Sequence, residues 1–283
     1  MLSCPYCNAD SEVYLSIYSR TYCKCLECDL VFRDLQESYD RTLASYCYDY
    51  FSEYSVDQTE GSRDSLFQHI LGLIEKRAEI GRVLDVGSGC GFFLLAAQKR
   101  GWKVKGIEPS LQSVKVSHGQ LGLDVFPGSL QDFSDKGTFD VITFINVLDH
   151  SAMPWLEIGR AYRLLRPGGL IYLRFPNGLL HNNLYRIIYR LGIHKRASKY
   201  LVFHQYSFTS RYIRRLLSDY GFSRCTSYNS PPTKGDPHRL FPDPAFATYV
   251  KRLVYTVARS IETLSLGRLY LGSSLDVTAV KPN

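Results

Sequence analysis

Four cysteines near the start of the chain have the spacing of a metal site. They form two Cys-x-x-Cys pairs, Cys4 with Cys7 and Cys25 with Cys28. The stretch between the pairs favours a short hairpin over residues 13–22. Four thiolates on two tight turns can surround zinc tetrahedrally, and a closed site with four protein ligands is structural. We expect residues 1–33 to form a zinc ribbon that needs its metal to fold, because so short a segment buries little apolar surface.

The start of the chain and its cysteine usage predict a reducing compartment. No secretion signal is recognisable at the N-terminus, and no apolar run reaches the roughly 18 residues of a membrane-spanning helix. We therefore expect a soluble cytoplasmic protein, in which paired cysteines are metal ligands rather than disulfides. Cys23 is a spare thiol, either a substitute ligand or a bystander of the site. Isolated cysteines are usually small buried hydrophobes, and this is the role expected of the remaining three: Cys47, Cys90 and Cys225.

A glycine-rich loop is the second group of residues that indicates chemistry. The strand-like segment 82–86 runs into Gly87-Ser88-Gly89-Cys90-Gly91, and a helix is predicted directly after it, over residues 92–100. A dinucleotide loop has the pattern Gly-x-Gly-x-x-Gly, which brings a helix N-terminus against a pyrophosphate. Here the third glycine comes one position early and Phe92 follows it. The spacing therefore argues against a dinucleotide as the ligand.

The elements that must position this loop are those of an α/β sheet. Apolar strands are predicted over residues 82–86, 103–107, 125–127, 139–144 and 169–175, each separated from the next by helix-like segments. The last segment, 274–281, alternates like an antiparallel final strand. We predict a Rossmann-like, doubly wound and mostly parallel sheet, in which ligands bind at the carboxyl ends of the strands.

The segment Asp85–Gly91 resembles the first motif of class I S-adenosylmethionine-dependent methyltransferases. Further matches follow in the order that this superfamily has them: Glu108 with Pro109, Gly128–Phe133, Phe139–His150, Arg163–Ile171 and His204–Thr209, the last leading into a helix over 210–220. Asp149 stands where the family commonly has Glu in Asn-Val-Leu-Glu-His. The matches cover about residues 80–230 and are similar to the branch that contains ubiquinone methyltransferases and sugar C-methyltransferases.

The resemblance implies a binding site for S-adenosylmethionine. Asp85 is expected near the ammonium group of the ligand, Glu108 at the ribose hydroxyls and Asp132 near the adenine amino group. The full set of cofactor-binding residues that it implies is Asp85, Gly87, Ser88, Gly89, Gly91, Glu108, Pro109, Asp132 and Asn146.

Two histidines are candidates for the catalytic base. Methyl transfer from a sulfonium needs alignment more than covalent help, so the acceptor's proton is what remains to be managed. His150, at the tip of the fourth strand, and His204, before the last helix, should both approach the pocket mouth if the family topology holds. Tyr206 is a third candidate. The alternative is that His150 only packs around the cofactor and His204 only fixes its loop.

The other segments are expected to surround the acceptor. Residues 34–80 are predicted to be a helical linker or lid; its aromatic run 46–54 belongs either to the core or to a lid, and its amphipathic helix 65–80 is assigned to packing, with no chemistry implied. Within a methyltransferase domain of residues 81–283, two insertions, 179–202 and 231–270, are expected to cap the pocket. The second insertion contains an apolar stripe over residues 245–264.

The charge of the chain bears on its partners. The chain is 45% hydrophobic and 22% charged, which fits an ordinary globular protein, and its net charge is +7. No Asp or Glu occurs from Ile158 to Ser218, whereas twelve basic residues do: Arg160, Arg163, Arg166, Arg174, Arg186, Arg190, Lys195, Arg196, Lys199, Arg211, Arg214 and Arg215. The resulting positive face suits a phosphorylated or lipid-linked acceptor, with peripheral membrane contact, or is simply a solvated surface.

The function predicted from the sequence is methyl transfer to a small molecule. A nucleotide-sugar, a lipid-linked sugar and a quinone-like compound stay open as acceptors, at O, N or C. One alternative is an RNA or protein acceptor, but no Asn/Asp-Pro-Pro-Tyr/Phe motif follows the fourth strand, so no specific nucleic acid is expected. Another is a non-catalytic adaptor with a vestigial Rossmann domain, against which the complete set of Asp85, Glu108 and the loop glycines argues. The oligomeric state stays open.

Overall fold

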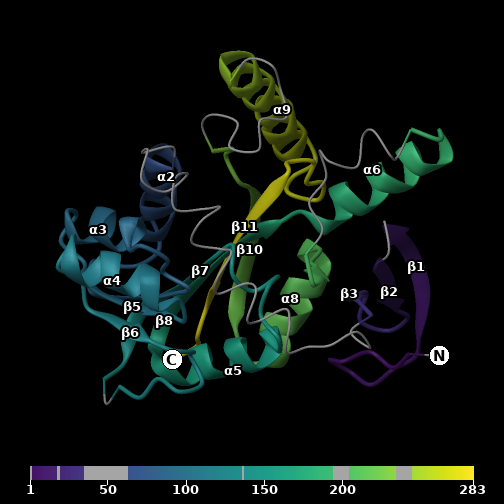
Figure 1. Cartoon of the computed structure of the whole chain (residues 1–283). Coiled ribbons are helices and arrows are strands. Elements are labelled where there is room, and N and C mark those ends of the chain that lie inside the picture. The colour runs from purple at the N-terminus through teal and green to yellow at the C-terminus, as the bar shows by residue number, and fades with distance from the viewer. Residues whose placement is uncertain (1, 18–19, 35–62, 136, 194–203, 234–243) are drawn as a thin grey trace.

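The computed structural model of the chain describes residues 2–17, 20–34, 63–135, 137–193, 204–233 and 244–283. These residues form two sheets with helices around the larger one (Figure 1). The aromatic run 46–54, with Cys47, lies outside the described residues, as does most of the predicted linker or lid. Lys195, Arg196 and Lys199 of the basic stretch also lie outside them.

The larger sheet has the predicted α/β topology. Its spatial order is β10 (Ser223–Asn229), β11 (Ser274–Val280), β8 (Leu165–Pro176), β7 (Phe139–Ile145), β4 (Arg82–Val86), β5 (Lys103–Glu108) and β6 (Val125–Pro127). The five strands from β8 to β6 are parallel, whereas β11 runs antiparallel to both β8 and β10. The winding reverses at β4, because the chain moves outward through β5 and β6 and then returns to β7 on the other side. The predicted fold class is confirmed.

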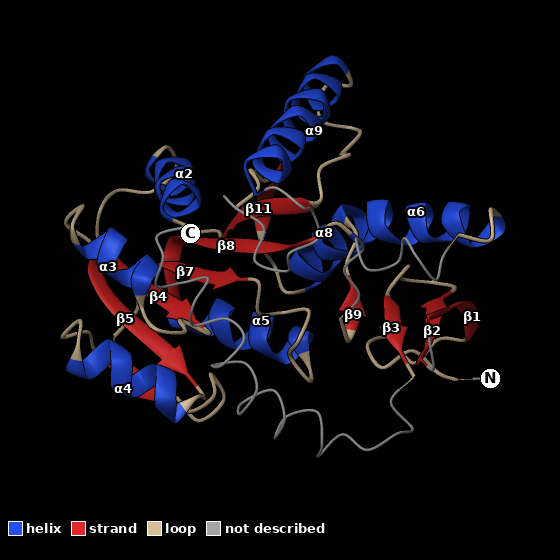
Figure 2. Ribbon diagram, turned by 45° about the horizontal axis from the view of Figure 1, so that its top comes forward, coloured by secondary structure: helices blue, strands red, loops and turns tan. Residues whose placement is uncertain are grey.

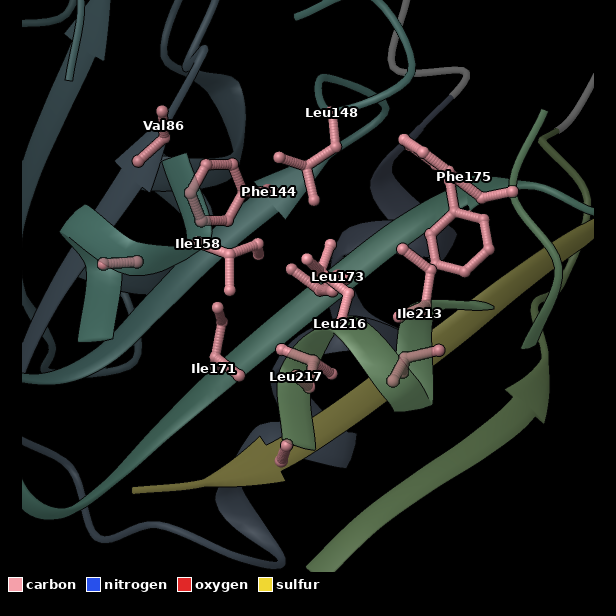
Figure 3. Packing of buried hydrophobic residues seen from close by; sticks show 14 of the residues in the cluster. Val86, Phe144, Leu148, Ile158, Ile171, Leu173, Phe175, Ile213, Leu216 and Leu217 are labelled. Atoms are coloured by element: carbon pink, nitrogen blue, oxygen red, sulfur yellow. The ribbon is translucent and has the colours of Figure 1, made fainter. Parts of the chain in front are cut away.

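Seven described helices accompany the sheets, and several of them cover the two faces of the large sheet, as its alternating side chains require. The seven are α2 (Asp64–Glu75), α3 (Phe92–Gln98), α4 (Leu111–Gly119), α5 (Pro154–Leu164), α6 (Gly178–Arg190), α8 (Ser210–Asp219) and α9 (Pro244–Leu264). Figure 3 shows one face, where Ile158 of α5 and Leu216 of α8 pack on Leu173 of β8. On the opposite face, Ile70 of α2 packs with Tyr172 of β8. Neighbouring residues of β8 thus point to opposite layers.

The smaller sheet contains the cysteine-rich segment. It consists of β1 (Ser11–Ile17), β2 (Arg20–Cys25), β3 (Val31–Arg33) and β9 (Tyr206–Ser207), in that order and all antiparallel. The expected hairpin is therefore β1–β2. The fourth strand, β9, was not predicted, because a two-residue strand has no periodic signal of its own. It comes from the large domain and ties the two sheets together.

The two helices expected to cap the pocket have different places. Figures 1 and 2 show α6 and α9 extending away from the large sheet. The buried side of α6 packs against the small sheet, where Tyr185 and Ile188 join Leu15 and Tyr22. Of the two, therefore, only α9 reaches the cavity described below. None of the described helices has the length and hydropathy needed to cross a membrane.

One local prediction differs from the structure, and two features were not predicted. The helix expected over 65–80 ends at Glu75, because the N–H groups of Arg77 and Ala78 both bond to the carbonyl of Ile74 and close a turn. The Pro-Gly-Gly segment after α5 lies inside β8 as a bulge. Strand β10 was not predicted, because its sequence is mostly polar; it is an edge strand.

Candidate active site

The glycine loop has a backbone that only glycine adopts easily. Gly87, Gly89 and Gly91 all have positive φ, at 70°, 54° and 86°. At Gly87 a Cβ atom would also lie 2.5 Å from Cγ2 of Val147, so a side chain there is excluded by space as well. The N–H group of Gly87 donates to the carbonyl of Ile107, at 2.8 Å, which fixes the loop to β5. The loop thus follows β4 at the carboxyl edge of the sheet, where the winding reverses.

Two buried carboxylates flank this loop. Asp85 is 3% exposed and its Oδ1 accepts a hydrogen bond of 2.6 Å from Oγ1 of Thr143. Burial raises the pKa of Asp85 to about 7, and the charge of Glu108 contributes in the same direction. Burial also raises the pKa of Glu108, whose two oxygens accept hydrogen bonds of 2.8 Å from the N–H groups of Gly89 and Ser110. Both groups are acceptors suited to an ammonium or to hydroxyls of a ligand.

The other residues of the predicted cofactor set lie around the same edge. The hydroxyl of Ser88 is buried and has no hydrogen-bond partner among the described residues, while Pro109 is exposed directly after Glu108. Asp132 is exposed in the turn after β6 and accepts a hydrogen bond from the hydroxyl of Ser129. Asn146 has positive φ and follows β7. Its Oδ1 accepts a hydrogen bond of 2.6 Å from Nη1 of Arg174, a contact that the sequence did not predict.

The two candidate catalytic histidines lie together. The ring centroids of His150 and His204 are 3.9 Å apart. Nε2 of each ring approaches Oδ2 of Asp149, at 3.7 Å for His150 and 3.5 Å for His204. Asp149 is 1% exposed, and neither of its carboxylate oxygens has a hydrogen bond from any described residue. The sequence analysis named both histidines but treated Asp149 only as a departure from the family motif.

This cluster has the composition needed for proton transfer. An imidazole can accept a proton, and a carboxylate beside it can stabilise the charge that results, so the three groups together have the parts of a general base. One ligand atom of each lies within 4.8 Å of the others, so the set also has the donors of a cation site. Tyr206 is not part of it: its hydroxyl donates to the carbonyl of Ala152, at 2.8 Å, and the side chain is 2% exposed.

The segment that carries His204 is attached to the small sheet. The hydroxyl of Tyr22 donates to the carbonyl of His204, at 3.0 Å, and the N–H of Arg33 donates to the carbonyl of Gln205, at 2.8 Å. The next residue, Tyr206, is paired with Phe32 of β3. The small sheet therefore determines where the backbone of His204 lies.

The four cysteines of the two pairs come together at the end of the small sheet. Sγ of Cys4 lies 3.7 Å from Sγ of Cys28, and Sγ of Cys7 lies 3.4 Å from Sγ of Cys25. Thiolates at about 2.3 Å from a tetrahedral zinc are roughly 3.8 Å apart, so these spacings fit that ion. The N–H group of Cys28 points to Sγ of Cys25, at 3.4 Å. Cys23 is buried and does not belong to the quartet.

A second group with a histidine and an aspartate lies where α2 meets β11 of the large sheet. Nε2 of His69, on α2, is 3.0 Å from Oδ2 of Asp276, on β11. The hydroxyl of Tyr172 donates to Oδ1 of Asp276, at 2.8 Å, and Nε of Arg174 lies 4.0 Å away. Sequence reasoning missed this group because α2 was assigned to packing. The available signal was a charged residue, Asp276, in the predicted final strand, but polar residues that alternate with apolar ones normally indicate a solvated face.

His69 also lines a cavity of about 320 Å³ between α2 and α9. Its described lining residues are Ser65, His69, Pro231, Pro232, Thr233, Thr248, Arg252 and Tyr255. Arg174 connects this cavity to the tip of β7, since its Nη2 donates to the carbonyl of Pro231, at 3.5 Å, and its Nη1 to Asn146. The cavity and the cluster of Asp149 therefore lie along one edge of the sheet.

Comparison with known proteins places the chain in a family. The methyltransferase domain family matches residues 59–226, which is more than half of the chain. An uncharacterized methyltransferase of Mycolicibacterium gilvum is 31% identical over 148 residues, covering 50% of this chain and 54% of its own length. A ubiquinone biosynthesis O-methyltransferase of Psychrobacter arcticus is 29% identical over 168 residues, covering 53% and 63%. The chain thus spans little more than half the length of the curated relatives it matches.

Solved structures have the same fold. A methyltransferase of Thermotoga maritima, described as a possible histamine N-methyltransferase, has a TM-score of 0.53 at 17% identity and covers 84% of this chain and 99% of its own. A methyltransferase of Archaeoglobus fulgidus has a TM-score of 0.53 at 18% identity and covers 83% and 100%. The sheet order, the loop and the family match agree with one another. The chain therefore belongs to the methyltransferase domain family.

Proposed function

We propose that S-adenosylmethionine binds at the carboxyl ends of β4 and β5 and that a small-molecule acceptor is methylated beside the tip of β7. The observation that carries the proposal is the pair of buried carboxylates, Asp85 and Glu108, on either side of the positive-φ glycine loop. In this assignment Asp85 binds the ammonium and Glu108 the ribose hydroxyls. The remaining contacts come from Gly87, Ser88, Gly89, Gly91, Pro109, Asp132 and Asn146.

The chemistry requires little from the protein beyond positioning and one proton acceptor. When bound, the cofactor supplies an activated methyl group, whose C–S electrons return to sulfur as the new bond to the acceptor forms. His150 or His204 accepts the proton that the acceptor loses. Asp149, within 3.7 Å of Nε2 of both rings, stabilises the resulting imidazolium. The absence of hydrogen bonds to Asp149 leaves its charge available for this role.

We also propose that Cys4, Cys7, Cys25 and Cys28 bind zinc in a structural site. The S–S distances and the closed set of four sulfur ligands support this. In the proposed organisation, residues 1–33 are a zinc ribbon and residues 81–283 the catalytic domain. The ribbon would contribute to catalysis only indirectly, by placing the segment of His204.

The acceptor classes that we propose are a nucleotide-sugar, a lipid-linked sugar or a quinone-like compound. The similarity to ubiquinone biosynthesis O-methyltransferases supports a small molecule rather than RNA or protein. A lipid-linked acceptor has support from α9, which exposes large apolar side chains next to basic ones. The apolar ones are Phe246, Tyr249, Leu253, Val254 and Val257.

Calorimetric titration with S-adenosylhomocysteine tests the cofactor site. Gly89→Arg should abolish binding, because Gly89 has positive φ and a side chain there strains the loop that is proposed to bind the ligand. Glu108→Ala should weaken binding by at least about tenfold, through loss of charge-assisted hydrogen bonds. Gly119→Arg is the matched control, since a Cβ there meets no atom within 4 Å. A well-folded wild-type protein that does not bind S-adenosylhomocysteine would overturn the proposal.

Asp85 gives this binding a pH signature. Because burial raises its pKa to about 7, Asp85 is mostly protonated at pH 6 in the free protein, and a ligand ammonium must first displace that proton. Affinity for S-adenosylhomocysteine should therefore rise between pH 5.5 and 7 and then level off. Titration of Asp85→Asn over the same range should give weaker binding with a flat profile. If the affinity changed equally with pH in the wild type and in Asp85→Asn, Asp85 would not be the group that binds the ammonium.

A further inference from the structure

The cavity between α2 and α9 is rich in hydrogen-bond donors. Six of its eight described lining residues carry a donor group: Ser65, His69, Thr233, Thr248, Arg252 and Tyr255. The described lining contains no carboxylate. A volume of about 320 Å³ holds a ligand group of the size of a phosphorylated monosaccharide or smaller, which is at the low end for small-molecule sites. Its chemistry therefore favours an anion with several acceptor atoms.

The imidazole of His69 is held in one orientation by groups beneath the cavity. Asp276 is fully buried, and each of its two oxygens accepts one hydrogen bond, from His69 and from Tyr172. A carboxylate accepts only, so Nε2 of His69 carries a hydrogen and Nδ1 is the ring nitrogen that remains for a ligand, to which it donates when the ring is protonated. A buried network of this kind fixes the donor geometry before a ligand arrives, which reduces the entropy lost on binding.

The charge at the cavity is positive. Beneath it, the charge of Arg174 is balanced by that of Asp276, 4.0 Å away. Of the described lining residues, Arg252 is the one that is charged at every ordinary pH, and His69 adds a second positive charge when protonated. Arg252 comes from α9 and His69 from α2, so two separate elements present ligand groups to one space.

We propose that this cavity binds a phosphate group of the methyl acceptor, with Arg252 and His69 as its principal ligands. Phosphate matches the site better than carboxylate, because its additional oxygens use more of the six donors. Arg174 links the cavity wall at Pro231 to Asn146 at the tip of β7, so one molecule can extend from the cavity to the transferred methyl group. The inference rests on the proposed function and narrows its acceptor to a phosphorylated compound.

The test uses the full chain with its ribbon intact and methyl phosphate as the probe. Calorimetric titration should detect binding of methyl phosphate, and acetate at the same ionic strength should bind more weakly. Arg252→Gln and His69→Gln should each lower the affinity for methyl phosphate by at least about tenfold. Arg268→Gln, an equal change of charge at an exposed position of the chain outside the cavity, should leave it unchanged.

Three outcomes overturn the proposal: no binding of methyl phosphate above chloride of equal ionic strength, acetate binding as tightly as methyl phosphate, or equal losses in Arg252→Gln and Arg268→Gln. Arg252 is exposed, so Arg252→Gln should fold and its affinity can be measured even if His69→Gln does not fold. Titration with S-adenosylhomocysteine is run separately on each protein. Loss of that binding alone counts against the proposed function, whereas intact cofactor binding without methyl phosphate binding counts against the phosphate site alone.

Discussion

Two histidine–aspartate groups lie on one edge of the same sheet, and they differ in how the carboxylate is satisfied. Asp276 is fully buried and both of its oxygens accept hydrogen bonds. Asp149 is almost as buried, yet neither oxygen accepts one from a described residue. A buried carboxylate without donors destabilises the fold, so its presence calls for a compensating role. This difference fits the proposed roles, in which the Asp276 group fixes geometry and the Asp149 group takes part in proton transfer.

The two groups also depend on different parts of the chain. His69 and Asp276 are supplied by α2 and β11, both of which belong to the large domain. His204 is placed by the ribbon, through Tyr22 and through the pairing of β3 with β9. Unfolding of the cysteine-rich segment should therefore disturb the group of His204 and leave the group of His69 intact.

Removal of the proposed zinc is the change with the largest expected effect. Zinc contributes on the order of 10 kcal/mol to the folding of small cysteine sites, so chelation or Cys25→Ser should unfold the ribbon. Hydrogen exchange should then increase in β1–β3 and in residues 204–208, with no change in α2 or β11. Cys23→Ser is the matched control, because this buried thiol lies outside the quartet. If chelation increased hydrogen exchange equally around His69 and His204, the two groups would not depend on different parts of the chain.

Substitution of the catalytic candidates should separate the two groups kinetically. With the acceptor found by screening phosphorylated small molecules, His204→Gln and His150→Gln should each lower kcat, and the larger loss should be about 10²- to 10³-fold, the usual contribution of a general base. His69→Gln should instead raise KM for the acceptor with little change in kcat, because it removes binding that is equal in ground and transition states. A fall of kcat in His69→Gln as large as in the other two would reverse the roles assigned here.

Truncation of each aspartate should separate the groups thermodynamically. Asp276→Ala leaves the hydroxyl of Tyr172 and the charge of Arg174 without their partner, which should lower the free energy of unfolding by about 3–5 kcal/mol. Asp149→Ala removes a buried charge that has no hydrogen bonds, so its effect should stay within about 1 kcal/mol or be stabilising. Urea unfolding at neutral pH measures both values. Similar losses in the two variants would mean that Asp149 has structural partners after all.

Local signals in the sequence were enough to predict the large sheet and the glycine loop. Its parallel strands are short apolar runs, and the loop glycines have a spacing that reports directly on backbone conformation. His150 and His204 were found because each lies in a motif of the family. The bulge at Pro167 in β8 escaped prediction because a Pro-Gly-Gly sequence equally fits a turn.

The group of Asp276 could not be predicted, because its parts lie far apart in the chain. His69 and Asp276 are separated by 207 residues, and a helix surface carries no signal for which strand it will meet. In β11 the polar residues Asp276 and Thr278 alternate with apolar ones, which normally indicates a solvated face. Here both side chains are buried, and His69 of α2 contacts Asp276. The pairing of β9 with β3 could not be predicted for the same reason. Its two strands are far apart in the sequence, so their contact depends on the topology of the whole fold rather than on a local pattern.

The smallest expected effects come from two tyrosine hydroxyls, one in each group. Tyr22→Phe removes the hydrogen bond to the carbonyl of His204 and should lower stability by about 1 kcal/mol, with a kcat loss of a few-fold as the histidine loses its position. Tyr172→Phe leaves Oδ1 of Asp276 unpaired in the interior, so its stability loss should be larger, about 1–3 kcal/mol, with kcat unchanged. Tyr249→Phe, at a side chain that is 65% exposed, controls for the substitution itself. Tyr22→Phe should have the larger effect on kcat, whereas Tyr172→Phe should have the larger effect on stability. A general loss of stability would lower kcat most in the less stable variant, so it would not give this pattern.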